Sequence, residues 1–310
     1  MHPALRATAA LAATGAAGLA YASVIERHWF ALRYGVLPVL PAGSDPIRVL
    51  HVSDLHLVPR QTRKREWVRS LAELEPDLVV NTGDNLSSLD AVPAALDTFS
   101  PLLDVPGVFV MGSNDYFAPH LKSPSRYLTS SYAERRQEDI PLPTDDLVAG
   151  FEARGWTNLN NRRVTLDVAG QRLDLVGLDD PHINRDDHSL VAGPVADDAA
   201  VGIGVVHAPY LRALDALTSD GVGAIIAGHT HGGQLAIPGY GALVTNCDLG
   251  TDRVKGVSRW WEGADNAPSS QAPADAAWLN VSAGLGSSPY APVRFACRPE
   301  ASLLTLVAKA

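Results

Sequence analysis

Short apolar runs alternate along the chain with segments of helical spacing. The six runs typical of buried strands are residues 47–53, 77–83, 107–113, 173–179, 202–208 and 223–229. Between the first two runs, Trp67, Leu71 and Leu74 recur on one side of a predicted helix within residues 62–74, and residues 92–99 have similar spacing. Strands that alternate with helices in this way predict an α/β protein whose parallel strands are joined by right-handed crossovers.

The C-terminal part has a different pattern. Residues 278–282, 293–297 and 301–307 read as strands that follow one another through turns, without helical spacing between them. We therefore expect a second sheet that is more antiparallel than the first.

The N-terminal residues form an apolar segment, 1–30. Residues 7–25 are 19 consecutive residues without a charge, which is just long enough to cross a bilayer. A membrane anchor, a cleaved signal peptide ending at Ala20-Tyr21-Ala22, and an Ala-rich helix packed on the domain all fit this segment. We favour a single anchor at the cell membrane with the catalytic domain outside the cytoplasm, although Arg6, Arg27 and Arg33 flank the segment on both sides and do not orient it firmly.

Two further boundaries follow from Pro, Gly and polar residues. Pro38, Pro41 and Gly43 indicate a linker over residues 31–46, so the main domain would span 47–310. Within it, the Pro-rich and polar residues 117–146 form an insertion that we expect to be a loop over the site.

Composition narrows the function classes. The chain has 310 residues, with 25 Lys and Arg against 34 Asp and Glu, a net charge of −9. Nonspecific nucleic-acid binding needs clustered positive charge, so we expect no nucleic-acid partner. The two cysteines, Cys247 and Cys297, exclude a disulfide framework and a four-cysteine zinc site.

Polar side chains follow one predicted strand after another. Because ligands bind at the carboxyl ends of parallel strands, these side chains would meet at one place. Imidazole and carboxylate groups suit Zn, Mn and Fe, and seven side chains are too many for one ion. Two divalent ions that share one carboxylate would use them all, and their charge would attract a phosphate to this acidic chain. The seven are Asp54, His56, Asp84, Asn114, His207, His229 and His231.

These residues lie in ordered motifs that resemble those of the calcineurin-like metallophosphoesterases. The family pattern is D-x-H, G-D-x-x, G-N-H-D/E, a lone His and G-H-x-H. Here the sequence has Asp54-Leu55-His56, Gly83-Asp84-Asn85, Gly112-Ser113-Asn114-Asp115, His207 and Gly228-His229-Thr230-His231. The VSDLHL start, the GHTHGGQ run at 228–234 and Arg-Pro-Glu at 298–300 are similar to a branch of membrane-associated bacterial phosphohydrolases.

The resemblance implies a four-layer αββα sandwich of two mixed sheets and hydrolysis of phosphate monoesters or diesters with Mn, Fe or Zn. By analogy, Asp84 would bridge the two ions. The first ion would be held by Asp54, His56, Asp84 and His231, and the second by Asp84, Asn114, His207 and His229.

The third motif departs from the family, because it reads Gly-Ser-Asn-Asp. Either Asn114 or Ser113 can occupy the ligand position; we prefer Asn114, since a carboxamide oxygen ligates metals better than a neutral hydroxyl. In both registers the family's histidine is missing. Asp115 would replace it as a general acid if its pKa is raised, with His120 and His182 as further candidates near the substrate. Asn85 would donate a hydrogen bond to the substrate.

Three functions remain open at this stage. The first is a metal-dependent phosphodiesterase or phosphatase, and the second is a pyrophosphatase acting on a lipid-linked or nucleotide-sugar diphosphate. The third is a catalytically weak metal-binding accessory protein, because of the missing histidine. The expected partner is a phosphorylated small molecule or a lipid headgroup. A basic run fits either a solvated helix face or contact with anionic lipids: Arg60, Arg63, Lys64, Arg65 and Arg69.

Overall fold

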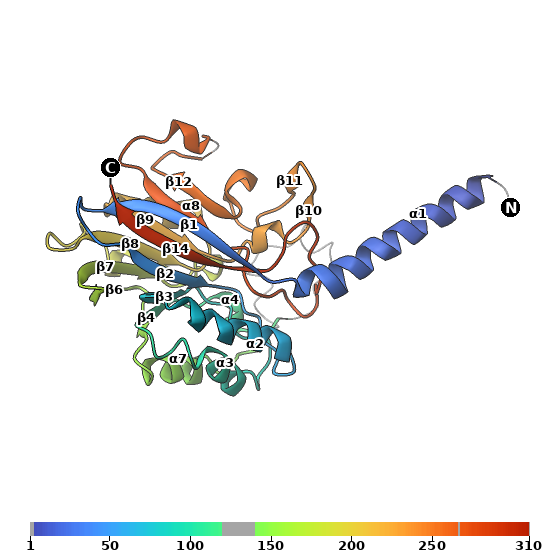
Figure 1. Ribbon diagram of the computed structural model, residues 1–310, viewed down its shortest axis with the longest axis horizontal. Coiled ribbons are helices and arrows are strands. Elements are labelled where there is room, and N and C mark those ends of the chain that lie inside the picture. The colour runs from blue at the N-terminus through green and yellow to red at the C-terminus, as the bar shows by residue number, and fades with distance from the viewer. Residues whose placement is uncertain (1–2, 120–139, 266, 310) are drawn as a thin grey trace.

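The computed structural model describes residues 3–119, 140–265 and 267–309. Within these residues, two six-stranded sheets face each other (Figure 1). The first sheet has the order β1-β14-β2-β3-β4-β5 and the second the order β12-β13-β9-β8-β7-β6. Most of the expected insertion, including His120, lies outside the described residues.

The first sheet is parallel in its centre and mixed at one side. Strands β2, β3, β4 and β5 run parallel, β14 is antiparallel to β2, and the edge strand β1 is parallel to β14. The bounds are β1 Ala31–Leu40, β2 Ile47–Val52, β3 Leu78–Asn81, β4 Gly107–Phe109, β5 Thr157–Asn158 and β14 Glu300–Ala308.

The second sheet is also mixed. Strands β7, β8, β9 and β13 run parallel, and the two edge strands β6 and β12 are antiparallel to their neighbours. The bounds are β6 Arg162–Val168, β7 Gln171–Leu178, β8 Val201–Val206, β9 Ala224–Ala227, β12 Gly256–Trp260 and β13 Ala277–Val281. A small hairpin, β10 Ala236–Ile237 and β11 Gly241–Ala242, stands apart from both sheets.

Helices cover the outer faces of the two sheets. Helices α2 (Thr62–Ser70), α3 (Val92–Phe99) and α7 (Thr144–Glu152) pack on the first sheet, and α8 (Leu211–Ser219) packs on the second. Between the sheets, apolar side chains of alternating strand residues interdigitate, such as Val49 and Val80 from the first sheet and Ile203 and Val205 from the second. The expected four-layer αββα sandwich is confirmed.

Two expectations about the chain's ends were wrong. Residues 31–46 are not simply a linker, because β1 occupies Ala31–Leu40 and pairs with β14 along its length. The three C-terminal segments do not form a separate sheet: β13 joins the second sheet and β14 joins the first. Residues 293–297 form only an isolated bridge from Phe295 to Leu235.

The first helix leaves the sandwich. Helix α1 (Pro3–Ala20) extends away from the two sheets (Figure 1). The helical segment Thr8–His28 is long and apolar enough to cross a membrane, and only 6% of its most apolar window is buried. An Ala-rich helix packed on the domain is therefore not what the structure shows.

Candidate metal centre

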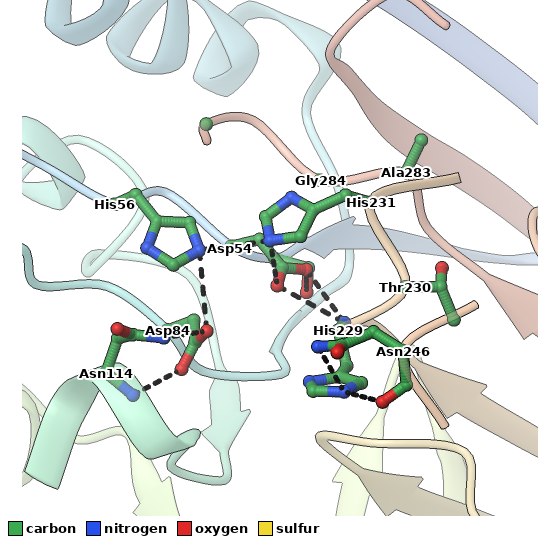
Figure 2. Close-up of polar contacts among 12 residues, drawn as sticks. Asp54, His56, Asp84, Asn114, His229, Thr230, His231, Asn246, Ala283 and Gly284 are labelled. Carbon is green, nitrogen blue, oxygen red and sulfur yellow. Dashed lines mark hydrogen bonds and ion pairs between the residues drawn. The ribbon is translucent and has the colours of Figure 1, made fainter. Parts of the chain in front are cut away.

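The seven expected ligands lie on loops that follow strand ends. Asp54 and His56 follow β2, Asp84 follows β3, and Asn114 lies in the short helix α4 (Ser113–Tyr116) after β4. His207 follows β8, and His229 and His231 follow β9. The two sheets bring these loops together at one edge of the sandwich, and Figure 2 shows side chains from both sheets turned toward one another.

Four side chains form the first group. Ligand atoms of Asp54, His56, Asp84 and His231 all lie within 4.8 Å of one another. His56 Nε2 lies 3.4 Å from Asp84 Oδ2 and 3.2 Å from His231 Nε2, which lies 3.7 Å from Asp54 Oδ1. This is the set expected to hold the first ion.

The second group lies on the other side of Asp84. His207 Nε2 is 3.6 Å from Asp84 Oδ1, and His229 Nδ1 is 3.3 Å from His207 Nε2. The Asn114 amide donates to Asp84 Oδ2 over 2.8 Å. Since amide oxygen and nitrogen exchange places by a simple flip, Asn114 can present its oxygen to an ion there. Asn114 thus contacts Asp84 directly, whereas Ser113 Oγ lies 3.4 Å from the Asn114 amide nitrogen, and Asn114 stays the predicted ligand of the two.

Hydrogen bonds to the backbone orient two of these imidazoles. His207 Nδ1 bonds to the Thr82 carbonyl over 2.6 Å, and His229 Nε2 bonds to the Asn246 carbonyl over 3.1 Å. A carbonyl only accepts, so each of these nitrogens carries the hydrogen. The opposite nitrogens, His207 Nε2 and His229 Nδ1, face Asp84 and each other, and each would offer its lone pair to an ion that replaces any hydrogen there. Lone pairs and carboxylates that converge in this way fit a bound cation.

Charge around the second group also favours a cation. Burial would lower the pKa of His207, but Asp84, Asp180 and Asp54 outweigh burial and raise that pKa to about 9. A divalent ion would replace the proton, because metal binding releases protons from its ligands. Burial lowers the pKa of His56 to about 4, so this imidazole is neutral and able to ligate. The donor set therefore fits two divalent ions that share Asp84.

Five of the seven positions have left-handed backbone. Their φ angles are 51° at Asp54, 43° at His56, 56° at Asp84, 69° at His229 and 50° at His231. Non-glycine residues adopt this conformation rarely, although Asp and His do so more readily than most. Each such residue costs on the order of 1–3 kcal/mol and persists where the surrounding structure enforces it. The left-handed conformation lets the backbone turn sharply at the end of each strand while the side chain still points to the centre.

A buried relay of hydrogen bonds holds Asp54. The Ser53 hydroxyl bonds to Asp54 Oδ2, Thr82 Oγ1 lies 2.7 Å from Ser53 Oγ, and His51 Nε2 lies 2.9 Å from Thr82 Oγ1. Asn280 of the second sheet reaches His51 Nδ1 over 2.9 Å. An ionised carboxylate only accepts, so every donor in this row points toward Asp54 and His51 carries its hydrogen on Nε2. The relay therefore runs from Asn280 in the second sheet to Asp54, an expected ligand, after a strand of the first.

Two glycines allow the loops to approach this closely. A Cβ on Gly228 would overlap the Ser53 hydroxyl and lie 2.7 Å from Asp54 Oδ2. A Cβ on Gly112 would overlap Asp84 and lie 2.6 Å from the His207 ring. Neither position has room for a larger residue, so both glycines are required by the packing of the centre.

The expected substitute for the missing histidine is already occupied. Asp115 is fully buried, and its oxygens accept backbone N–H groups of Asp84 at 2.8 Å, Asn85 at 2.7 Å and Gly112 at 3.1 Å. Burial and Asp84 raise the pKa of Asp115 to about 7, while these N–H groups oppose the increase. Asp115 therefore ties the loops after β3 and β4 together, and the general-acid role expected for it is not supported by its position.

Of the other expected residues, Asn85 is buried and His182 lies beside the centre. The Asn85 side chain bonds to Asn81 over 2.8 Å and to Asp115 over 3.3 Å, so it serves the loop. The ring of His182 lies 4.5 Å from the ring of His229, and its Nδ1 lies 3.0 Å from the Tyr210 hydroxyl. Among the described residues, His182 is thus the expected substrate contact that lies next to a ligand.

Several residues at the centre were not predicted from the sequence. Thr82, Asn246 and Asn280 act through hydrogen bonds to ligands or to His51. Arg294 is a further such residue. It is fully buried, donates to the Ala283 carbonyl over 2.7 Å, and lies 3.3 Å from His231 Nδ1.

Known proteins resemble this chain along most of its length. The uncharacterized metallophosphoesterase YkuE of Bacillus subtilis (strain 168) is 26% identical over 97% of this chain and 93% of its own length. Phosphodiesterase YaeI of Escherichia coli (strain K12) is 25% identical over 98% of this chain and 97% of its own length. Among solved structures, purple acid phosphatase PPD1 from yellow lupin seeds matches 62% of this chain and 39% of its own, with 13% identity and a TM-score of 0.37.

A family model for calcineurin-like phosphoesterases matches residues 47–233, more than half of the chain and all seven expected ligands. On this match, and with the donor groups of both sheets gathered around Asp84, the chain belongs to the calcineurin-like phosphoesterase family.

Proposed function

We propose that this chain hydrolyses a phosphate diester with two divalent ions of Mn, Fe or Zn. The observation that carries the proposal is the convergence of two donor groups on the two oxygens of Asp84. The diester is our first substrate class because the Escherichia coli relative is named a phosphodiesterase. When bound, such ions supply a more acidic water and neutralise charge on phosphate oxygens.

Hydrogen bonds within the chain hold the expected ligands in position. The relay to Asp54 and the backbone bonds to His207 and His229 fix three ligands before any substrate arrives. Pre-organised groups of this kind stabilise developing charge without rearranging during the reaction. We assign His182 to a phosphate oxygen of the substrate, since its ring lies against His229 at the edge of the second group.

The missing histidine limits the substrates that we propose. The Asp115 carboxylate accepts hydrogen bonds from loop N–H groups, so we do not assign it to the protonation of a leaving oxygen. General acid catalysis contributes roughly 10²–10⁴-fold to a rate. A diester with a good leaving group needs this contribution least, and it is the substrate with which activity should be sought.

We further propose that α1 remains attached as a membrane anchor. The segment after α1 is built into the domain: Ala22 is buried, and its carbonyl accepts the Arg294 N–H over 3.0 Å. Glu26 is also buried and accepts the N–H groups of Ala296 and Cys297 at 3.0 and 2.6 Å. A cleavage after Ala22 would cut the chain inside these contacts. The cell membrane and an extracytoplasmic domain remain the proposed location.

The full chain in detergent, assayed with Mn²⁺ and bis(p-nitrophenyl) phosphate, tests the proposed reaction. We expect Asp84→Asn and His207→Ala to lose at least about 10³-fold in turnover, because the first removes the negative charge between the two donor groups and the second removes an imidazole. His188→Gln is the matched control, since His188 pairs with Asp220 away from the centre. All variants should retain the circular dichroism spectrum of the unsubstituted chain.

Different results identify the alternatives. Unchanged turnover in Asp84→Asn would show that the centre is elsewhere. Turnover of a diphosphate or a monoester in place of the diester would correct the substrate class. Metal binding without turnover of any of the three would leave the accessory role as the better account.

A further inference from the structure

The hairpin that follows the metal centre is apolar and exposed. Residues 235–244, here the apolar hairpin, begin four residues after His231 and contain no charged side chain. They include strands β10 and β11 and the turn between them. Five of its apolar side chains are about half exposed or more: Leu235, Ile237, Tyr240, Leu243 and Val244. Clusters of exposed apolar residues on one projecting element mark interaction sites.

The apolar hairpin lies next to the base of α1. The Tyr21 ring, just after α1, lies 6.1 Å from the Phe295 ring in an edge-on contact. The Phe295 carbonyl accepts the Ala236 N–H over 2.9 Å, and Phe295 is bridged to Leu235. One residue therefore touches both the end of the apolar helix and the start of the apolar hairpin.

Strand directions place the base of α1 at the same edge as the metal centre. Strand β1, which follows α1, runs parallel to β14, and β14 runs antiparallel to β2. The start of β1 therefore lies beside the carboxyl end of β2, where Asp54 and His56 follow. In Figure 1, α1 and the β10–β11 hairpin lie on the same side of the sandwich, opposite the labels of β6 and β7.

Basic side chains lie at the same base. Phe30, which precedes β1, stacks on Trp67 of α2 with ring centroids 5.2 Å apart. Arg60 lies just before α2 and Arg63 in its first turn, and both are exposed. Anionic lipid headgroups attract such cations near a membrane surface.

We propose that the apolar hairpin inserts into the lipid bilayer that holds α1, with Arg60 and Arg63 facing its anionic headgroups. We assign the apolar hairpin to a bilayer because the helix that could span a membrane leaves the sandwich beside it. A bilayer that holds α1 would therefore lie close to the hairpin. Tyr240 at the turn has the apolar ring and polar tip that favour a membrane interface. The proposal rests on the proposed anchoring by α1, and it places the metal centre near the lipid surface.

Nitroxide labels on single introduced cysteines test the proposal with the full chain in vesicles of three parts phosphatidylcholine to one part phosphatidylglycerol. The tested variants are Tyr240→Cys and Leu243→Cys. Leu11→Cys reports whether α1 is inserted, and Asp167→Cys is the exposed control on the β6–β7 hairpin at the opposite end of the strands. The unsubstituted chain measures the background from Cys247, which is partly buried, and the buried Cys297.

Collision of each label with oxygen and with a water-soluble nickel chelate distinguishes lipid from water. We expect the ratio of oxygen to nickel collisions at 240 and 243 to exceed that at 167 at least threefold. Equal ratios at 240, 243 and 167, with a lipid-embedded label at 11, would overturn the hairpin proposal alone. A water-exposed label at 11 would overturn the anchoring and this proposal with it. Labels at 240 and 243 that neither reagent reaches would indicate a protein cover and overturn it as well. None of these readings depends on phosphodiesterase activity.

Discussion

The position of Asp54, an expected ligand, depends on residues that would not themselves contact an ion. Its carboxylate is held by Ser53, which depends in turn on Thr82, His51 and Asn280. The partners that orient a ligand affect metal affinity nearly as strongly as the ligand itself. The Thr82 hydroxyl is the middle member of the relay, so removing it separates the Asp54 end from the His51 end.

We predict that Thr82→Val weakens metal binding about 10–100-fold, because it leaves Ser53 without its donor. It should also lower the free energy of unfolding by about 1–3 kcal/mol, since buried polar partners lose a hydrogen bond. Thr98→Val is the matched control: Thr98 is buried too, but its hydroxyl bonds to the Ala94 carbonyl within α3. Calorimetric titration with Mn²⁺ gives the affinities, and equal metal affinity in both variants would contradict a role for the relay.

The convergence of the expected ligands could be predicted from the sequence, but the hydrogen bonds that hold them could not. Asp54, His56 and the His229–His231 pair lie in spaced motifs directly after apolar runs. The sequence therefore predicts both the kind of side chain and its place at the end of a strand. Thr82 and Asn280 are ordinary strand-end and strand residues, and their role depends on which strands face each other across the two sheets. The hydrogen bonds that Asp115 accepts could not be predicted, because its neighbours in sequence say nothing of the N–H groups that surround it.

At the scale of elements, burial explains which strands the sequence revealed. The central strands β2, β3, β8 and β9 are buried almost throughout and stand out as apolar runs. The edge strand β6 is largely half-buried, and its polar residues interrupt the apolar run by which a strand is recognised in the sequence. Strand β1 contains Pro38, which an edge strand tolerates because one side of its backbone needs no partner. That proline led to the expectation of a linker.

Two neighbouring substitutions in β1 test whether this strand belongs to the fold. Leu37 is fully buried between the sheets, whereas Val36 is 61% exposed. We predict that Leu37→Ala lowers the free energy of unfolding by about 2–5 kcal/mol, because it leaves a cavity in the core. Val36→Ala should change it by no more than about 0.5 kcal/mol. Urea unfolding in detergent measures both, and a small effect from both would mean that β1 contributes little to the core.

At the scale of the whole molecule, the metal centre joins the two halves of the sandwich. The first sheet supplies Asp54, His56 and Asp84, and the second supplies His207 and the His229–His231 loop. Apolar packing between the sheets holds these loops at the distances described above, and left-handed backbone at five positions stores strain at their junction. A bound cation would relieve the repulsion among the converging donors, so metal binding and folding should be coupled.

This coupling predicts that metal removal destabilises the chain. Ligand that binds only the folded state at 100 times its dissociation constant adds about 2.7 kcal/mol to the free energy of unfolding. We therefore expect EDTA to lower the melting temperature by several degrees and Mn²⁺ to restore it. Asp84→Asn should abolish the increase caused by Mn²⁺, because Asp84 faces both donor groups, whereas His188→Gln should keep it. Differential scanning calorimetry in detergent measures the shifts. If Mn²⁺ raised the melting temperature of Asp84→Asn as much as that of the unsubstituted chain, the stabilising ions would bind outside this centre, because the variant lacks the carboxylate that faces both donor groups.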